Sequence, residues 1–145
     1  MKMVVQRVSS AKVNVSGKVV GEISKGYCTL LGVKDGDSSE DAKFLADKLT
    51  KLRVMADEDD KMNLDLKSVG GEVLVVSQFT LHADTTKGNR PAFTKAAKPE
   101  LAEKLYEMFI VRLRDNGLKV ETGVFGAMMD INVELDGPVT IIIES

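Results

Sequence analysis

The chain has 145 residues, of which 43% are hydrophobic and 29% are charged, and its formal net charge is −2. This composition is that of one ordinary globular domain, large enough to bury a core without metal or disulfide support, and the net charge argues weakly against a nucleic-acid partner. No apolar run approaches the roughly 20 residues that a membrane-spanning helix needs.

The first residues favour a cytoplasmic protein, and the single cysteine is expected to be structural. The N-terminal segment reaches Gln6 and Arg7 after about three apolar residues, which is too few for the core of a signal peptide. Cys28 cannot form an intrachain disulfide, and it lies in the apolar run YCTLLGV. Because no neighbouring basic residue lowers its pKa, we expect a buried and unreactive thiol.

The first third of the chain is rich in predicted strands. Residues 3 to 8 and 11 to 15 indicate two short strands, and the segment NVSGKVVGEI is typical of a hairpin with Gly17 at its turn. The run GYCTLLGV is almost continuously apolar and is bounded by glycines, which predicts a buried central strand.

Two amphipathic helices are predicted from apolar residues at helical spacing. Ser38 or Ser39 can cap the first helix, and Pro99 is well placed in the first turn of the second, which ends at Gly117. The apolar residues of the two helices are Ala42, Leu45, Leu49 and Leu52, and Ala102, Leu105, Phe109 and Leu113.

The remaining strands are expected between and after these helices. RVMA resumes a strand, DEDDKMN is a polar loop, and GEVLVVSQFT is the clearest buried strand, followed by the loop HADTTKGNRP. The segment 129–135 alternates between apolar and polar residues as a half-buried strand does, and VTIIIE is a last strand. We therefore predict one α/β domain over residues 1–145, a mixed β-sheet system with two helices packed on one side.

Asp136 and Gly137 lie between two apolar runs, as in a hairpin turn, yet Pro138 follows at once and removes a backbone donor. A Gly-Pro bond that is cis would aim two successive carbonyls in one direction, and such a pair could bind an amine. The alternative is a trans proline that opens an edge strand.

The usual catalytic groups are scarce. His82 is the only histidine, and no cysteine, second histidine or acidic cluster follows at the spacing of zinc ligands. Neither phosphate-loop fingerprint, GxxxxGK[ST] or GxGxxG, is present, so we expect no metal and no nucleotide cofactor. A triad in which His82 reaches Ser77 or Thr80 stays open, although a histidine beside a strand end is more often structural.

Two other features could bind a substrate. Ser77, Gln78 and Thr80 offer hydroxyls, an amide and backbone donors, which are the groups of an oxyanion-type site, or they simply end a strand. Residues 1–21 and 85–99 carry basic side chains and no acid, which indicates either a phosphate-binding face or scattered solvated lysines.

The segments SQFTL at 77–81 and GPVT at 137–140 are similar to the paired motifs of the D-aminoacyl-tRNA deacylase family. Further segments resemble that family in the same order, so the resemblance covers the whole chain. Among them are KMN at 61–63, GGEVLVVSQFTLHAD at 70–84, KGNRPAF at 87–93, LYEMF at 105–109 and TGVFGAMM at 122–129.

The resemblance implies a homodimeric enzyme with a three-layer β/β/α fold and active sites at the subunit interface. It implies that the partner is the 3′ end of aminoacyl-tRNA, without cofactor or membrane. The reaction would be hydrolysis of the ester between a D-amino acid and the terminal adenosine, and glycine mischarged on alanine tRNA would also be released. A cytoplasmic location fits this role.

The resemblance also implies roles for individual residues. The carbonyls of Gly137 and Pro138, in a cis step, would reach into the partner's site, hold the α-amino group and leave no room for an L side chain. The catalytic segment would be Ser77, Gln78, Phe79 and Thr80. Substrate binding would also involve Phe125 near the adenine, Met129, and Arg7 in a supporting role. The chain departs from the family pattern at Leu135, where asparagine is usual, and at Met128.

Several mechanisms remain open at this point. Backbone donors could polarise the ester while water attacks with help from the 2′-hydroxyl of the tRNA, or Thr80 could be the nucleophile. The alternatives from other classes are a non-catalytic RNA-binding module that uses the basic stretches and an esterase that uses His82.

Overall fold

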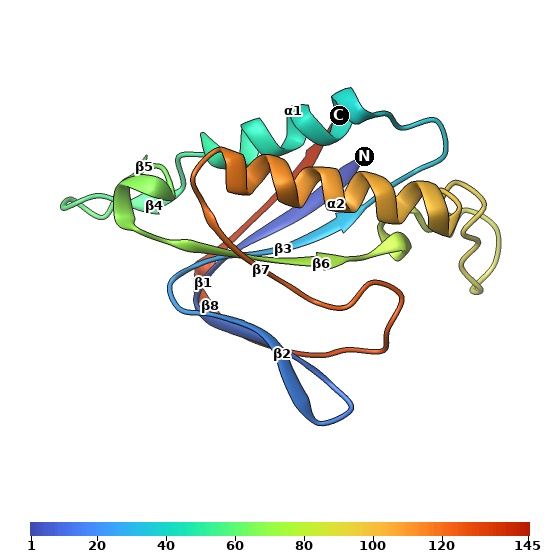
Figure 1. Cartoon of the computed structure of the whole chain (residues 1–145), viewed down its shortest axis with the longest axis horizontal. Helices are drawn as coiled ribbons and strands as arrows, with labels where there is room; N and C mark the ends of the chain where they lie inside the picture. Colours follow the sequence, from blue (N-terminus) through green and yellow to red (C-terminus); the bar gives the residue numbers. More distant parts are fainter.

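Two helices lie across one face of a six-stranded sheet in the computed structural model, which describes residues 1–145 (Figure 1). The strands are β1 (Lys2–Val15), β2 (Lys18–Ile23), β3 (Gly26–Gly32), β4 (Met55–Ala56), β5 (Met62–Leu64), β6 (Glu72–Ser77), β7 (Lys119–Thr122) and β8 (Asp130–Glu144). The helices are α1 (Ser39–Thr50) and α2 (Pro99–Asp115), with short 3-10 turns η1 (Lys67–Val69) and η2 (Phe79–His82).

The sheet is mixed and is organised around β1. This strand pairs antiparallel with β2, β3 and β8, while β3, β6 and β7 run parallel to one another. The β1–β2 hairpin turns at Ser16 and Gly17, both with positive φ angles, as the tightest hairpin turns require. The predicted mixed sheet and the predicted hairpin are therefore confirmed.

Two separate cores divide the molecule into layers. The larger core, of 22 buried residues, lies between the helices and the sheet and includes Tyr27, Leu45 and Phe109. A smaller core of seven residues, including Cys28 and Leu74, lies on the opposite face of β3 and β6, where β2 packs against β6 and β7. The curled sheet thus forms two layers below the helices, and Cys28 is buried as expected.

The helices begin where the sequence indicates. Ser38 is the N-cap of α1 and forms a capping box with Asp41, whose carboxylate accepts bonds from the Ser38 amide and hydroxyl at 2.8 Å each. Pro99 occupies the first turn of α2, where its missing N–H costs nothing. Neither helix is both long and apolar enough to cross a membrane.

Both long strands differ from their prediction. Residues 3–8 and 11–15 belong to one strand, because Ser10 continues the pairing with Glu134 of β8. The prediction of two separate strands before and after Asp136-Gly137 is also wrong. Both halves of β8 pair with β1, and residues 136–139 form a bulge opposite the single residue Arg7. The bulge accommodates the missing donor of the proline without ending the strand.

Smaller differences concern short elements. Only Met55 and Ala56 of RVMA are in a strand, and they pair with β5, which overlaps the end of the expected polar loop and extends to Leu64. The buried strand β6 ends at Ser77 because η2 follows at Phe79. The four-residue strand β7 was not predicted, since it is too short to show a pattern.

Candidate functional site

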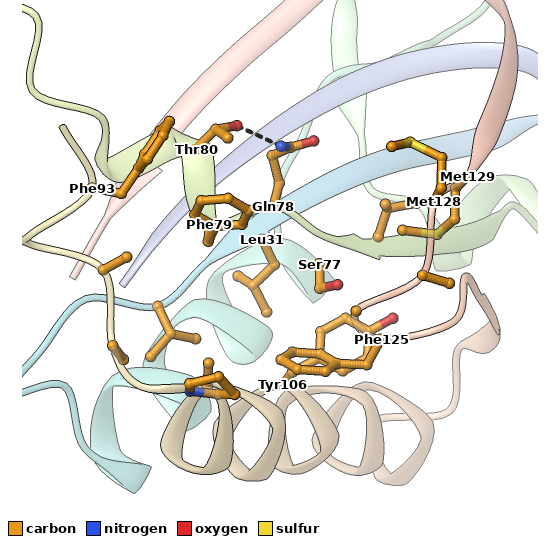
Figure 2. Close-up of a pocket in the computed structure, with 18 of the residues that line it drawn as sticks. Leu31, Ser77, Gln78, Phe79, Thr80, Phe93, Tyr106, Phe125, Met128 and Met129 are labelled. Carbon is orange, nitrogen blue, oxygen red and sulfur yellow. Dashed lines mark hydrogen bonds between the residues drawn. The ribbon is translucent and has the colours of Figure 1, made fainter. Parts of the chain in front are cut away.

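A cavity of about 840 Å³ lies at the carboxyl end of β6 (Figure 2). Its walls come from the end of β6 and η2, from the loop before α2, from α2 itself, and from the loop 123–129. Fourteen of the 19 lining residues are hydrophobic and none carries a charge. The cavity is therefore suited to a flat or apolar group with a few polar atoms.

The segment SQFT forms the polar side of the cavity. Ser77 ends β6, and the Gln78 amide donates to the carbonyl of Leu31 at 2.8 Å, which fixes where the chain leaves the sheet. In η2 the amide of Leu81 donates to the Gln78 carbonyl at 3.3 Å, so the amides of Phe79 and Thr80 precede the first bond of this turn. Backbone donors of that kind can face a ligand oxygen.

Aromatic rings form two walls. Phe93, from the loop before α2, packs edge-to-face on Phe79 with ring centroids 5.0 Å apart and an interplanar angle of 71°. Tyr106 of α2 packs on Phe125 of the loop 123–129 with centroids 5.9 Å apart. Figure 2 shows the two pairs on different sides of the space, with Ser77 between them. A flat ring could therefore stack inside the cavity.

No acid or base with an ordinary pKa near neutrality lines this cavity. The Thr80 hydroxyl accepts a hydrogen bond from the side-chain amide of Gln78, which cannot remove its proton. His82 does not pair with Ser77 or Thr80, and its Nε2 is buried without a hydrogen-bond partner. Burial raises the pKa of Tyr106. The arrangement offers donors and shape rather than proton transfer by a side chain.

The structure brings six of the nine predicted site residues together. These are Ser77, Gln78, Phe79, Thr80, Phe125 and Met129. Arg7, Gly137 and Pro138 lie elsewhere. Ser77 of β6 pairs with Leu31 of β3, which pairs with Met3 of β1, and Arg7 lies four residues farther along β1. The strands β6 and β8 are three strand spacings apart, because β3 and β1 lie between them. Together with the offset of four residues along β1, this places the two motifs of one chain roughly 20 Å apart.

The Gly137-Pro138 segment is exposed in the bulge of β8, and its peptide bond is cis, the isomer that the resemblance implies. Arg7 contacts this segment through Asp136. Its Nε donates to the Asp136 carbonyl at 3.2 Å and lies 3.1 Å from the Asp136 carboxylate, while Nη1 donates to the Val54 carbonyl at 2.8 Å. Leu135, which replaces the usual asparagine, pairs with Val8 and is 47% exposed.

Two aromatic lining residues were not singled out from the sequence. Phe93 and Tyr106 both lie in segments that resemble the family, but neither received a role. Tyr106 belongs to the buried face of α2, where an aromatic residue is normally interpreted as core.

No group of three or more His, Cys, Asp or Glu side chains lies together in the structure where it could hold a metal ion.

Comparisons with known proteins agree over the whole chain. A family model described as D-Tyr-tRNA(Tyr) deacylase matches residues 4–144. A D-aminoacyl-tRNA deacylase from an Exiguobacterium species is 57% identical over 144 residues, covering 99% of this chain and 98% of the relative. One from Thermus aquaticus is 56% identical over 145 residues, covering 100% and 95% of the two chains.

Two solved structures have the same fold. The structure named c-Myc DNA Unwinding Element Binding Protein has a TM-score of 0.93 and 40% sequence identity, covering 100% of this chain and 99% of that one. A second, described as a probable eukaryotic D-amino acid tRNA deacylase, has a TM-score of 0.86 at 16% identity, covering 99% and 98%, and is similar in fold alone.

Proposed function

The chain belongs to the D-aminoacyl-tRNA deacylase family, and from that premise we propose that it hydrolyses the ester bond of D-aminoacyl-tRNA in the cytoplasm. The products are the free D-amino acid and tRNA. The observation that carries the proposal is the cavity at the end of β6, where the SQFT segment faces an aromatic wall and no charged side chain intervenes. The terminal adenosine stacks on Phe125, and the ester lies at η2.

The proposed chemistry depends on positioning and on backbone donors. An aminoacyl ester is already activated, so amides that stabilise the developing oxyanion can suffice once water is correctly placed. The 2′-hydroxyl of the terminal ribose assists that water. Thr80 is a poor nucleophile in this setting, because its contact with Gln78 supplies a proton donor rather than a base.

We further propose that selection for handedness is made by a second copy of the chain. Gly137 and Pro138 are exposed in the bulge of β8 but lie roughly 20 Å from the cavity of their own chain, by the spacing of strands and residues in the sheet. In a homodimer they would enter the partner's cavity and bind the α-amino group. Exposed apolar residues on the same strand, Leu135 at 47% and Ile142 at 65%, favour contact with another protein surface.

A main-chain selector excludes a side chain in the L position, so it does not exclude glycine, which has no side chain. We therefore propose that glycine attached to alanine tRNA is also released. This extension depends on the same cavity and requires no additional residue.

The test is incubation of the purified protein with D-tyrosyl-tRNA and L-tyrosyl-tRNA, with release of each amino acid measured over time. We expect rapid release of D-tyrosine and little release of L-tyrosine. The His82→Ala variant should retain this activity, because the buried Nε2 of His82 forms no hydrogen bond with Ser77 or Thr80. Equal release of both enantiomers, or loss of activity in the His82 variant, would contradict the proposal.

A second candidate is a nucleic-acid-binding protein without turnover. The name of the 40% identical solved structure favours it, as does the segment 85–99, which carries four basic residues and no acid. It predicts binding that weakens steeply with salt and no release of amino acid. The same incubation therefore distinguishes the two candidates.

A further inference from the structure

The backbone carbonyl of Val75 accepts hydrogen bonds from two elements outside its strand. The amide of Gly123, where the loop 123–129 begins, donates to this oxygen at 3.1 Å. The hydroxyl of Tyr106, from α2, donates to the same oxygen at 2.8 Å, and this bond is buried. Val75 lies two residues before Ser77 on β6. One oxygen atom thus joins the catalytic strand, the helix and the loop that carries Phe125.

Phe125 forms a partition between two spaces. Its ring lines the main cavity, and it also lines a second cavity of about 450 Å³ on the side of α2. Tyr106 is the other aromatic residue that lines both, and it is 5% exposed with its ring centroid 5.9 Å from that of Phe125 (Figure 2). Because Phe125 borders open space in two directions, its contact with Tyr106 matters for where its ring lies.

The loop itself is closed tightly at its base. A Cβ added to Gly123 would lie 2.5 Å from the sulfur of Met129, so the two ends of the loop touch. Between them the hydrogen bond from the Ala127 amide to the Val124 carbonyl, at 3.2 Å, closes a turn that contains Phe125. The loop is therefore held together by its own contacts, and the Tyr106 side chain is the aromatic link between it and α2.

We propose that Tyr106 is a positioning residue for the terminal nucleobase of the substrate. The hydrogen bond from its hydroxyl to the Val75 carbonyl fixes the position of the Tyr106 ring relative to β6. The Tyr106 ring in turn holds the Phe125 ring at the face of the main cavity. The inference rests on the proposed function, because it takes the nucleobase to stack on Phe125.

The hydroxyl and the ring of Tyr106 have separable effects. Replacing tyrosine with phenylalanine keeps the ring but removes the hydroxyl. Of the two donors to the Val75 carbonyl, only the Gly123 amide is then left. The ring can then shift toward the smaller cavity, and Phe125 can follow it. Since burial favours the protonated phenol, the hydroxyl remains a donor throughout the working pH range.

The experiment compares Tyr106→Phe with Tyr27→Phe. The two tyrosines of the chain are a matched pair, because each donates from its hydroxyl to a backbone carbonyl, that of Leu52 at 3.2 Å for Tyr27, and each has a buried ring. Tyr27 does not line the main cavity. Both variants lose one hydrogen bond and should lose similar thermal stability, so a purely structural role predicts the same behaviour for both.

Two readouts separate positioning from stability. The first is the dissociation constant of a stable D-tyrosyl adenosine analogue in which a 3′-amide replaces the ester, and the second is KM against kcat for D-tyrosyl-tRNA. For Tyr106→Phe we expect the dissociation constant and KM to rise about three- to tenfold, with kcat within about twofold, from loss of one hydrogen bond. For Tyr27→Phe we expect binding constants within about twofold of the parent.

The double variant Tyr106→Phe/Phe125→Ala tests whether Tyr106 acts through Phe125. If it does, removing the hydroxyl should have little further effect on analogue binding once the Phe125 ring is absent. The proposal is overturned if Tyr106→Phe binds as the parent does, or if the two losses multiply. A parent protein that binds the analogue but does not release D-tyrosine contradicts the proposed function alone, and the analogue measurements then decide the role of Tyr106.

Discussion

The Thr80 hydroxyl allows the two proposed mechanisms to be separated at a single residue. Because its partner is the Gln78 amide, Thr80→Ala should remove a donor or a contact, not a covalent step. We expect single-turnover release of D-tyrosine to slow by about ten- to a hundredfold, as for loss of one hydrogen bond to a charged group. Mass spectrometry of the quenched parent enzyme should show no acyl adduct. A trapped ester on Thr80, with complete loss of activity in the variant, would establish the nucleophile instead.

Thr29 is a buried residue whose hydroxyl has no hydrogen-bond partner. Thr29→Val keeps the shape of the side chain, removes the unpaired polar atom and suits a central strand. We expect the free energy of unfolding in urea to rise by about 1 kcal/mol. The control is Thr50→Val, because the Thr50 hydroxyl donates to the Ala46 carbonyl at 2.8 Å and accepts from Asn116 at 3.0 Å. That variant should be destabilised, and equal destabilisation of both would refute the argument.

Residues of the site were predictable where they are neighbours in the sequence. Ser77 to Thr80 form one segment at a strand end, and their meeting in a cavity follows from that local pattern. Phe93 and Tyr106 reach the same cavity from a loop and from a helix, so their role depends on packing that no local pattern contains. The distance between Gly137 and the cavity depends on how β8 pairs, which is also a long-range property.

At the level of elements, strong periodicity predicted structure well and turn chemistry alone did not. The helices α1 and α2 follow the expected apolar spacing and caps, except that Leu52, expected on the first helix, lies beyond the end of α1 at Thr50. Asp136-Gly137 carries the residues of a hairpin turn, yet both flanking runs have the same partner, β1, and the chain continues through a bulge. A local turn pattern cannot show which strand each flank will pair with, so one strand was interpreted as two.

The two helices are joined by an ion pair that should depend on pH. Asp47 of α1 accepts bonds from the Arg112 guanidinium at 2.7 and 2.9 Å and from Asn116 at 2.9 Å. These hydrogen bonds, first those from Arg112, lower the Asp47 pKa to about 2. The stabilisation is therefore complete above the unfolded pKa of about 3.9 and is lost as pH falls toward the folded value.

Asp47→Asn should consequently lower the urea midpoint at pH 7, and the difference from the parent should shrink at pH 3. Both partners are about one-third exposed, with 31% and 37% of their side-chain surface accessible, so solvent screening keeps the effect modest. Asp115→Asn on α2 is the control, because its carboxylate is exposed and forms no ion pair. An effect of Asp47→Asn that is unchanged at pH 3 would show that the charge is not its source.

An acidic segment and a basic segment lie at opposite ends of the long axis of the molecule (Figure 1). The acidic loop 57–60, between β4 and β5, lies at one end, and the basic segment 85–98 lies at the other (Figure 1). Phe93 of that segment is part of the cavity wall. Although the net charge of the chain is −2, the basic segment 85–98 therefore lies next to the site. Such a field would orient a polyanion so that its terminus meets the cavity.

Three exposed cations of this basic end, Lys87, Arg90 and Lys98, form no ion pair within the chain, whereas Lys95 lies 3.3 Å from Asp84. Replacing the three with glutamine should weaken binding of uncharged tRNA at low salt and reduce the slope of log affinity against log salt by about 2. Lys43, Lys48 and Lys51, near or on α1, provide a control triple of equal charge. Hydrolysis of a D-tyrosyl adenosine ester, which lacks the phosphates, should be unchanged in both triples. An equal salt slope in the two would show that net charge, rather than the basic end, governs RNA binding.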